Sequence, residues 1–394
     1  MNRWRYIADN IGVTKYKERH KLKEAVERIA ASNQLAADRL SPMTFPKTLD
    51  EAFHNKTVLV TGGTGSIGRE IVRQVLQYGP RVVRVYSRNE YNQYVMRKDF
   101  NDRPDLRFMI GDVRDRERLM RACEDVEVLF HASALKHVEV CEYNPFEAVK
   151  TNVSGTQNVV EAALDYNMEL LVGISTDKAV SPTNTMGATK LLSERVVLAA
   201  NKYKGDRRTR FTVIRFGNVL ASRGSAIPRF IQQIRDGGPV TLTHRDMRRF
   251  FMSIPQAVEL ALTASLKSRG GDIYILKMPV LRIADLISAL VEIYAPRFNR
   301  KPEDIEVKEI GLLPGEKLYE SLMTPEEALY ATEQDSYYQV EPLRAIDQQR
   351  LTDPPAGYDS AAEPLLSKDE IIQMLASQGL VEVFMAALPE VAGE

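Results

Sequence analysis

The chain has very little cysteine: Cys123 and Cys141 are the two cysteines among 394 residues. Their spacing is not that of a disulfide framework or a cysteine-rich zinc site, so we expect two reduced thiols. An excess of charge of one sign is also absent, because 53 Lys and Arg residues balance 53 Asp and Glu residues. Such a chain has no global field that would attract nucleic acid or an acidic membrane surface, and we expect neither as a partner.

Long apolar runs are missing as well. No run reaches the roughly 18 residues that a membrane-spanning helix needs, and the longest candidates, such as Leu170–Ser175, are short enough to be buried strands. The start of the sequence, Met1–Arg5, is polar and basic, which does not indicate a signal peptide. From these features we expect a cytoplasmic protein with no membrane span.

From Lys56 onward, short apolar segments alternate with segments of helical periodicity. The predicted strands are residues 57–61, 82–86, 106–110, 126–130, 170–175 and 211–216, and the predicted helices include residues 69–78, 145–167 and 187–202. This alternation predicts an α/β fold with a doubly wound parallel sheet of the Rossmann type. After about residue 225 the pattern is less regular and rich in Pro and Arg, which predicts a smaller mixed C-terminal lobe for the substrate.

These patterns divide the chain into four expected parts. Residues 1–50 form a helical extension, in which Leu22, Val26, Ile29 and Ala36 keep helical spacing. Residues 51–225 form the dinucleotide-binding domain, residues 226–345 the substrate lobe interleaved with it, and residues 346–394 a linker and a final helix. The sequence from Ser367 to Glu370 predicts a capping box at the start of that helix.

A glycine-rich loop, Thr61-Gly-Gly-Thr-Gly-Ser-Ile-Gly68, follows the first predicted strand and opens the first predicted helix. Glycines let the backbone turn sharply and approach a pyrophosphate, which the amides of the helix N-terminus then hold. Strand, loop and helix in this order predict a dinucleotide site. The expected cofactor contacts in the loop are Thr61, Gly62, Thr64, Gly65, Ser66, Ile67 and Gly68.

Further cofactor contacts are expected where the later strands end. Ser87 and Arg88, after the second strand, offer a hydroxyl and a guanidinium in place of the carboxylate that would select NAD. These groups suit a 2′-phosphate, so we expect NADP, with NAD as the second choice. Residues expected beside the adenine and along the passing cofactor are Asp112, Val113, Ala132, Ser133 and Ala134.

Two histidines in this region, His131 and His137, lie six residues apart. No third ligand accompanies them, whereas protein zinc sites use three or four protein ligands. We therefore expect no metal site.

Several motifs in the same order resemble one family. The glycine loop is similar to the TGxxGxxG signature of extended short-chain dehydrogenases/reductases. Ser175-Thr-Asp-Lys-Ala-Val180 closely resembles the STDKA motif of bacterial UDP-N-acetylglucosamine 4,6-dehydratases of surface-glycan pathways. The similarity extends from about Lys56 to Val340. It includes Asn144-Pro145, Lys150-Thr151-Asn152, residues 215–219, residues 249–252 and residues 314–319.

The resemblance implies a reaction and a role for each catalytic residue. The family oxidises C4 of the sugar with NADP⁺, removes the C5 proton, expels the C6 hydroxyl as water and returns the hydride to C6. This chemistry needs an acid and a base beside the nicotinamide. By resemblance Asp177 is the acid at C6, Lys178 the base at C5, and Thr176 a hydrogen-bonding partner at O4. For a neutral Lys178 we expect a depressed pKa, caused by partial burial near cations such as Lys190.

One position departs from the wider short-chain dehydrogenase pattern Tyr-x-x-x-Lys. Lys190 is in place to hold the nicotinamide ribose, but Met186 occupies the tyrosine position and cannot exchange a proton. Some dehydratases of the family also carry Met here. The group that accepts the C4 hydroxyl proton is left open among Thr176, Asp177 and a water molecule.

The resemblance also suggests substrate contacts, with UDP-N-acetylglucosamine or a close analogue as the substrate. Lys136 is expected to touch cofactor or substrate, Asn218 the sugar or phosphate, Arg249 the pyrophosphate and Glu316 the nucleotide ribose. Alternative phosphate contacts are Arg223, Arg229 and Arg248. We further expect a homo-oligomer, with the predicted helices 145–167 and 187–202 as candidate interfaces.

Three alternatives stay open at this stage. An inverting dehydratase that also epimerises C5 is favoured by Ser87-Arg88 and by residues 337–340. A non-catalytic NADP-binding regulator would explain the missing tyrosine, but it would have no need of the acid–base pair. A 4-epimerase or a reductase on the same fold would depend more directly on that tyrosine.

Overall fold

The structure is a computed structural model that describes residues 46–220, 222, 225–341 and 357–382. From Lys47 onward these residues belong to one compact unit. The expected helix around Leu22–Ala36, the alternative phosphate ligand Arg223 and residues 346–356 of the expected linker lie outside the described residues.

A nine-stranded sheet forms the centre of the described residues. Its strands, from one edge to the other, are β14 (Ala331–Glu333), β15 (Tyr337–Val340), β10 (Ile273–Leu276), β6 (Arg210–Phe216), β5 (Leu170–Thr176), β4 (Val128–His131), β1 (Thr57–Thr61), β2 (Val82–Ser87) and β3 (Leu106–Ile110). The strands from β10 to β3 pair in parallel, and β15 and β14 add antiparallel pairs at one edge. The predicted doubly wound parallel sheet is confirmed, and its order reverses between β1 and β4.

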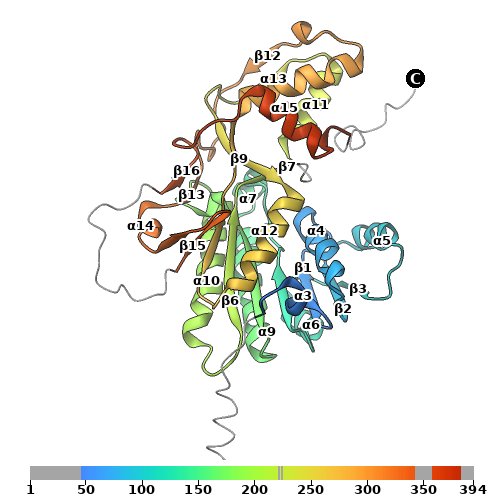
Figure 1. Cartoon of the computed structure of the whole chain (residues 1–394), viewed down its shortest axis with the longest axis vertical. Coiled ribbons are helices and arrows are strands. Elements are labelled where there is room, and N and C mark those ends of the chain that lie inside the picture. The colour runs from blue at the N-terminus through green and yellow to red at the C-terminus, as the bar shows by residue number, and fades with distance from the viewer. Residues whose placement is uncertain (1–45, 221, 223–224, 342–356, 383–394) are drawn as a thin grey trace, which may run out of the picture. The chain divides into compact units, whose positions relative to one another are not determined.

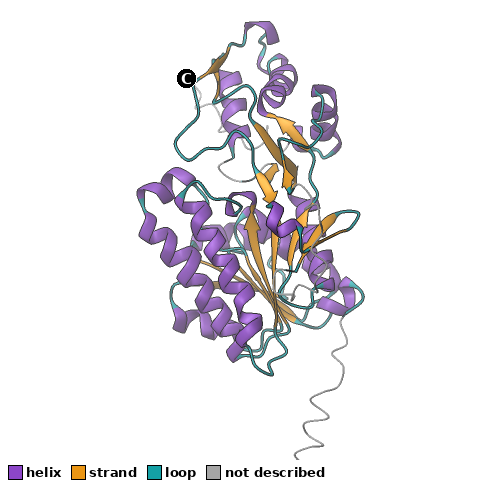
Figure 2. Ribbon diagram, turned by 90° about the vertical axis from the view of Figure 1, so that its left-hand side faces the viewer, coloured by secondary structure: helices purple, strands orange, loops and turns teal. Residues whose placement is uncertain are grey.

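Helices cover both faces of this sheet (Figure 2). On one face α12 (Ile254–Lys267) packs on α4 (Ser66–Val75) and α3 (Leu49–Phe53). On the other, α9 (Gly155–Asp165) packs between α6 (Arg116–Cys123) and α10 (Thr185–Tyr203). α5 (Glu90–Asp99) packs on β2 and β3. Because both faces are covered, the strands are continuous apolar runs, and all five residues of β1 are buried.

A second, smaller hydrophobic core belongs to the C-terminal lobe. It contains Ile231 of α11 (Ala226–Asp236), Leu290 of α13 (Ile283–Tyr294) and Leu375 of α15 (Lys368–Ser377). Figure 1 shows these three helices together, above the sheet. The predicted capping box of the last helix is confirmed, since Ser367 and Glu370 bond each other's backbone amides.

The remaining strands of the described residues are short and form three small sheets outside the large one. They are β7 (Asn218–Leu220), β8 (Val240–Leu242), β9 (Arg248–Ser253), β11 (Val280–Arg282), β12 (Val307–Glu309), β13 (Ser321–Met323) and β16 (Tyr358–Asp359). β9 lies between β11 and β7, β8 pairs with β12, and β13 pairs with β16. Among the described residues, no helix combines the length and the apolar character needed to cross a membrane.

The predicted helix over residues 145–167 is present from Pro145 to Asp165, but it is not a regular α-helix throughout. The segment is divided into α8 (Pro145–Ala148), a wider π-helical turn (Val149–Ser154) and α9. Within the π turn, the Asn152 side chain bonds the amide and the carbonyl of Leu135 and the hydroxyl of Thr189. A π turn inserts an extra residue into a helix and often accompanies a functional site. Here it holds the chain that follows β4 against α10.

Candidate active site

A cavity of about 690 Å³ lies at the C-terminal ends of β1, β4, β5 and β6. One side is lined by the β1–α4 loop and by residues that follow β4 and β5, and the other by side chains of the smaller lobe such as Phe230, Leu242 and Met247. Its volume is within the range of small-molecule sites. Its position at the strand ends beside the switch point is where doubly wound sheets bind their ligands.

The glycine loop forms one wall of this cavity and fits a pyrophosphate. Gly62 has φ +67°, and a Cβ there would lie 2.8 Å from the backbone of Ala132; a Cβ on Gly68 would lie 2.3 Å from the Gly62 carbonyl oxygen. No side chain caps α4, whose cap residue Gly65 lines the cavity together with Ser66. The amides of this helix end can therefore face an anion in the cavity.

Two of the residues predicted to contact the cofactor from this loop do not line the cavity. Thr61 and Thr64 are buried and do not line it, whereas Gly62, Gly65, Ser66, Ile67 and Gly68 do. The Thr61 hydroxyl lies 2.7 Å from Nδ1 of His131. The other ring nitrogen of His131 lies 3.0 Å from the Thr156 hydroxyl.

His131 is thus a core residue. Burial, with a smaller contribution from Lys190, lowers the pKa of His131 to about 3, so the ring is neutral. No group of three or more His, Cys, Asp or Glu side chains arranged for a metal ion occurs in the described part of the chain.

The residues predicted to contact the adenosine half of the cofactor lie outside the cavity, at the ends of β2 and β3. The exposed Arg88 has its Nη1 atom 3.8 Å from Oδ2 of Asp112, whose carboxylate also accepts from Arg114. Ser87 is buried, with its hydroxyl 3.0 Å from Nε2 of Gln93. Val113 is buried too.

Ala132 and Ala134, after β4, line the cavity, but Ser133 does not. Lys136 follows them and also lines the cavity. Its neighbour Leu135 is the residue held by Asn152 of the π turn. The sequence places Asn152 in a motif without assigning it a role, and its clamp on the backbone is visible only in the folded chain.

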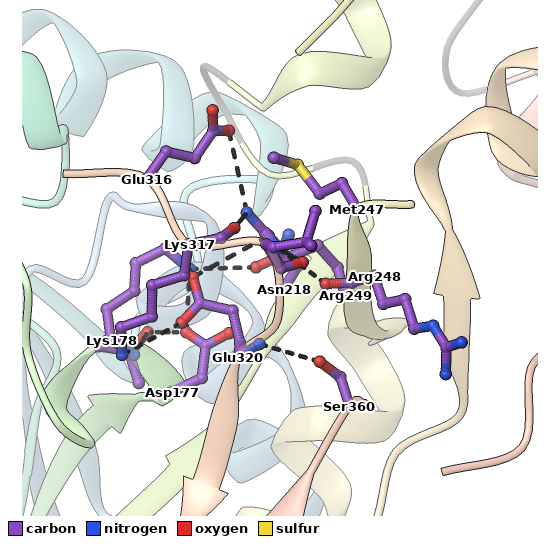
Figure 3. Close-up of polar contacts among 12 residues, drawn as sticks. Asp177, Lys178, Asn218, Met247, Arg248, Arg249, Glu316, Lys317, Glu320 and Ser360 are labelled. Carbon is purple, nitrogen blue, oxygen red and sulfur yellow. Dashed lines mark hydrogen bonds and ion pairs between the residues drawn. The ribbon is translucent and has the colours of Figure 1, made fainter. Parts of the chain in front are cut away.

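The three predicted residues at the end of β5 lie close together, and Figure 3 shows two of them, Asp177 and Lys178. Oδ1 of Asp177 lies 2.8 Å from the Thr176 hydroxyl and 3.0 Å from Nζ of Lys178. Thr176 and Lys178 line the cavity, but Asp177 is fully buried and does not. The Asp177 carboxylate therefore contacts the cavity only indirectly, through the Thr176 hydroxyl and the Lys178 amine.

The expected depression of the Lys178 pKa is wrong. Burial and Arg249 act to lower it, but the charges of Asp177 and Glu320 outweigh them, and the pKa of Lys178 is raised. The two carboxylates lie 3.0 Å and 3.6 Å from Nζ. In this state the amine is an ammonium ion held between two acids.

The positions of the Tyr-x-x-x-Lys pattern also face the cavity. Nζ of Lys190 donates to the carbonyl of Ile174 over 2.7 Å, and burial lowers the pKa of Lys190 to about 8, although Glu194 opposes this shift. Met186 lines the cavity and packs in a small apolar cluster with Cys141 and Ala148. Met186, at the tyrosine position, is therefore part of this small apolar cluster.

All four predicted substrate contacts, Lys136, Asn218, Arg249 and Glu316, line the cavity. Arg249 also has a structural role, because its guanidinium donates to the carbonyls of Arg248, Lys317 and Leu318 over 2.7–3.1 Å. It therefore holds the segment that carries Glu316. Of the alternatives, Arg229 lines the cavity, whereas Arg248 points away from the site (Figure 3) and donates to the Ala361 carbonyl.

One acidic residue of the site was not predicted. Glu320 is buried, its Oε1 atom lies 3.6 Å from Nζ of Lys178, and Oε2 has no hydrogen-bond partner. Burial raises the pKa of Glu320, and Asp177 adds to the rise, although Lys178 and Arg249 lower it. A signal was present, because Glu320 directly follows the motif of residues 314–319.

The chain matches known proteins over most of its length. A family described as polysaccharide biosynthesis protein matches residues 58–342. An uncharacterized membrane protein of Methanocaldococcus jannaschii is 53% identical over 82% of this chain and 96% of its own length. The inverting UDP-N-acetylglucosamine 4,6-dehydratase of Campylobacter jejuni is 41% identical over 75% of this chain and 86% of its own length.

Epimerases are also among the relatives. A UDP-glucose 4-epimerase of Rickettsia rickettsii is 42% identical over 73% of this chain and 83% of its own length. Among solved structures, that of Pen from Bacillus thuringiensis is 42% identical, with a TM-score of 0.77 over 83% of this chain and 98% of that one. The family resemblance found in the motifs is confirmed. The chain belongs to the polysaccharide biosynthesis protein family, whose members include nucleotide-sugar dehydratases and epimerases.

Proposed function

We propose that this protein is an NADP-dependent nucleotide-sugar 4,6-dehydratase, which converts UDP-N-acetylglucosamine or a close analogue into the UDP-4-keto-6-deoxy sugar for surface-glycan biosynthesis. The observation that carries the proposal is the placement of Thr176, Asp177 and Lys178. These residues bring a hydroxyl, a carboxylate and an amine together, with Oδ1 of Asp177 within 3.0 Å of the other two groups, at the cavity that the glycine loop also lines. An acid and a base beside a dinucleotide loop suit internal oxidation followed by elimination.

The dinucleotide would be held by the residues already described. The amides at the start of α4 would bind its pyrophosphate, Lys190 its nicotinamide ribose, and the exposed Arg88 with Ser87 a 2′-phosphate. When bound, this cofactor supplies a hydride acceptor at C4 and a hydride donor at C6. Replacing Arg88 with alanine tests the preference for NADP over NAD. Affinity for NADP should fall about tenfold, because one charge-assisted contact is lost, and affinity for NAD should stay the same.

Thr176 and Asp177 can handle the proton of the C4 hydroxyl. Met186 cannot accept it, whereas the Thr176 hydroxyl lines the cavity and lies 2.8 Å from Asp177. In the proposed sequence Thr176 takes the C4 proton while passing its own to Asp177. The same relay in reverse protonates the C6 hydroxyl, which then leaves as water. The proton released at C4 is thus consumed at C6.

Lys178 handles the C5 proton. Its side chain lines the cavity, so a neutral amine there can take the proton once C4 is a ketone and the C5–H bond is acidic. The electron pair of that bond forms the C5–C6 double bond as the C6 hydroxyl departs. After hydride reaches C6, the same amine returns the proton to C5.

The test is to incubate the purified protein with UDP-N-acetylglucosamine and no added cofactor. We expect a 4-keto-6-deoxy product, and NMR of that product in D₂O shows whether C5 is retained or inverted. An unchanged C6 hydroxyl with an altered C4 centre would instead establish a 4-epimerase, the activity named for the Rickettsia relative. Unreacted substrate with tightly bound cofactor would favour the non-catalytic alternative.

A further inference from the structure

The position of Lys178, with carboxylate oxygens 3.0 Å and 3.6 Å from its Nζ atom, creates a chemical requirement that rests on the proposed function. To remove the C5 proton, the amine must first be neutral, yet in the structure it is an ammonium ion between two carboxylates. A proton must leave Nζ before each turnover. Releasing it to bulk water would separate a buried charge pair and leave two uncompensated acids.

The two carboxylates beside Lys178 differ in how well their negative charge is supported. Oδ1 of Asp177 lies within hydrogen-bond distance of both the Thr176 hydroxyl and the Lys178 amine. Glu320 has weaker partners: Nζ of Lys178 at 3.6 Å, Nε of Arg249 at 4.0 Å and Nζ of Lys317 at 3.9 Å. One oxygen of each carboxylate, Oδ2 of Asp177 and Oε2 of Glu320, makes no hydrogen bond, so the difference lies in the two hydrogen bonds that Oδ1 of Asp177 makes. Of the two, Glu320 loses less by accepting a proton.

We propose that Glu320 accepts the proton of Lys178 when substrate fills the cavity, which converts the ion pair into a neutral amine beside a neutral carboxylic acid. One N–H bond of the ammonium breaks and one O–H bond forms on Oε1, so the net charge of the site does not change. The neutral amine then takes the C5 proton of the substrate. Because Glu320 acts through Lys178, it is a positioning residue, not a catalytic one.

Substrate binding supplies the driving force. The Lys178 side chain is 24% exposed, through the cavity that it lines, whereas the Glu320 side chain is 4% exposed and lies behind it. A ligand in the cavity removes the remaining water from Nζ. Desolvation disfavours the charged forms of both groups, so the equilibrium moves toward the neutral pair.

The surroundings keep Glu320 within reach of the amine. Its backbone amide donates to the Ser360 hydroxyl over 2.9 Å, and the Ser360 amide donates back to the Glu320 carbonyl over 2.9 Å. Arg249 binds the carbonyls of Lys317 and Leu318 just before it. Figure 3 shows the Glu320 side chain directed toward Lys178 and Asp177. Because the backbone on both sides of Glu320 is fixed, a small movement of the two side chains is enough to shorten the 3.6 Å distance between Oε1 and Nζ to that of a hydrogen bond.

The pH dependence of turnover distinguishes a proton acceptor from a charge partner. The ion pair and the neutral pair hold the same number of protons, so the wild-type rate should not vary with pH around neutrality. In Glu320→Gln the amine must lose its proton to solvent. Its kcat should fall at least about tenfold at neutral pH and rise about tenfold per pH unit above it.

The controls separate this effect from damage to the fold. Glu320→Asp keeps a proton acceptor and should retain the flat pH profile, with a reduced rate. Glu326→Gln neutralises an exposed carboxylate of the same lobe and should change neither rate nor profile. If Glu320→Gln were slower by a constant factor at every pH, or faster because the charge holding the ammonium is gone, the proposal would be wrong.

A second measurement does not require turnover. With saturating UDP-N-acetylglucosamine, the infrared difference spectrum of the wild type should gain the carbonyl band of a protonated carboxylic acid, and Glu320→Gln should lack it. A wild type that binds the nucleotide sugar without this band contradicts the role of Glu320, whatever the reaction. A wild type that shows the band and forms no 4-keto-6-deoxy product contradicts the proposed function alone.

Discussion

The two sides of the cavity are built in different ways. On the sheet side, defined here as residues 62–68, 132–136 and 176–178, each group directly follows a parallel strand, and sheet hydrogen bonds fix where that strand ends. On the lobe side, defined as Arg249 and residues 316–320, the acidic groups belong to a segment without helix or strand. That segment is held by side chains from distant parts of the chain.

The contacts of the lobe side show this dependence. Arg249 binds two of its carbonyls, Nζ of Lys317 donates to the Val180 carbonyl over 2.8 Å, and Ser360 binds Glu320 on both sides. The sheet side takes its shape mainly from where the strands end, whereas the lobe side depends on contacts with segments that are distant in the chain. Apart from Glu320, which acts on the reaction through Lys178, mutations should therefore affect chemistry most on the sheet side and the retention of substrate most on the lobe side.

The largest effect is expected at the acid–base pair of the sheet side. Lys178→Met and Asp177→Asn should each lower kcat at least about a hundredfold, the scale of a lost positioned acid or base. Cofactor retention should not change, since neither residue belongs to the glycine loop. Initial rates of 4-keto-6-deoxy sugar formation measure the effect. Near-native rates in both variants would remove the proposed mechanism.

The next effect concerns the glycine loop. In Gly68→Ala the new Cβ would lie 2.3 Å from the Gly62 carbonyl oxygen, so the backbone of the loop must shift. Overpacking of this kind costs about 2 kcal/mol, which corresponds to about thirtyfold weaker dinucleotide binding. Titration with NADP measures it. The control is Gly173→Ala in β5, where the nearest atom would be 3.5 Å away and binding should be kept.

On the lobe side, Arg249→Lys keeps the charge but loses the planar group that bonds three carbonyls. We expect kcat/KM to fall about tenfold, mainly through KM, and the free energy of unfolding to fall by about 1 kcal/mol. Steady-state kinetics and urea titration give both numbers. Arg245→Lys, at an exposed position of the same lobe, is the matched control. A loss of kcat with unchanged KM would contradict the distinction between the two sides.

The smallest effect is a pH dependence of stability at Lys190. Burial lowers its pKa from 10.5 to about 8 in the folded protein. Between these values the unfolded chain binds more protons, so the free energy of unfolding should rise as pH increases from about 8 to about 10.5. Urea unfolding of the wild type and of Lys190→Met over this range gives the comparison. The rise should be smaller in the variant, and equal slopes would show that Lys190 is not responsible.

Much of the fold was predictable because it repeats a local pattern. The strands 57–61 and 106–110 were predicted with the bounds that the structure has, since each is a short, mostly apolar segment of the alternating strand and helix pattern. The helix over residues 145–167 was predicted as well, but its π turn was not, because that turn depends on the bonds of Asn152 to Leu135 and Thr189. The prediction of a lowered pKa for Lys178 was wrong because this pKa also depends on a distant residue. Glu320 lies 3.6 Å from Nζ of Lys178 in space but 142 positions further along the chain.

The sequence by itself determined the doubly wound sheet, the glycine loop at the end of β1 and the neighbouring Asp177 and Lys178, because strand periodicity and turn chemistry act over a few residues. Only the tertiary structure decided which of these groups faces the cavity. It buried Asp177, left Lys178 and Thr176 at the surface of the cavity and placed Glu320 behind the amine. Burial and charge act through space, so proton affinities at this site follow from which segments pack together.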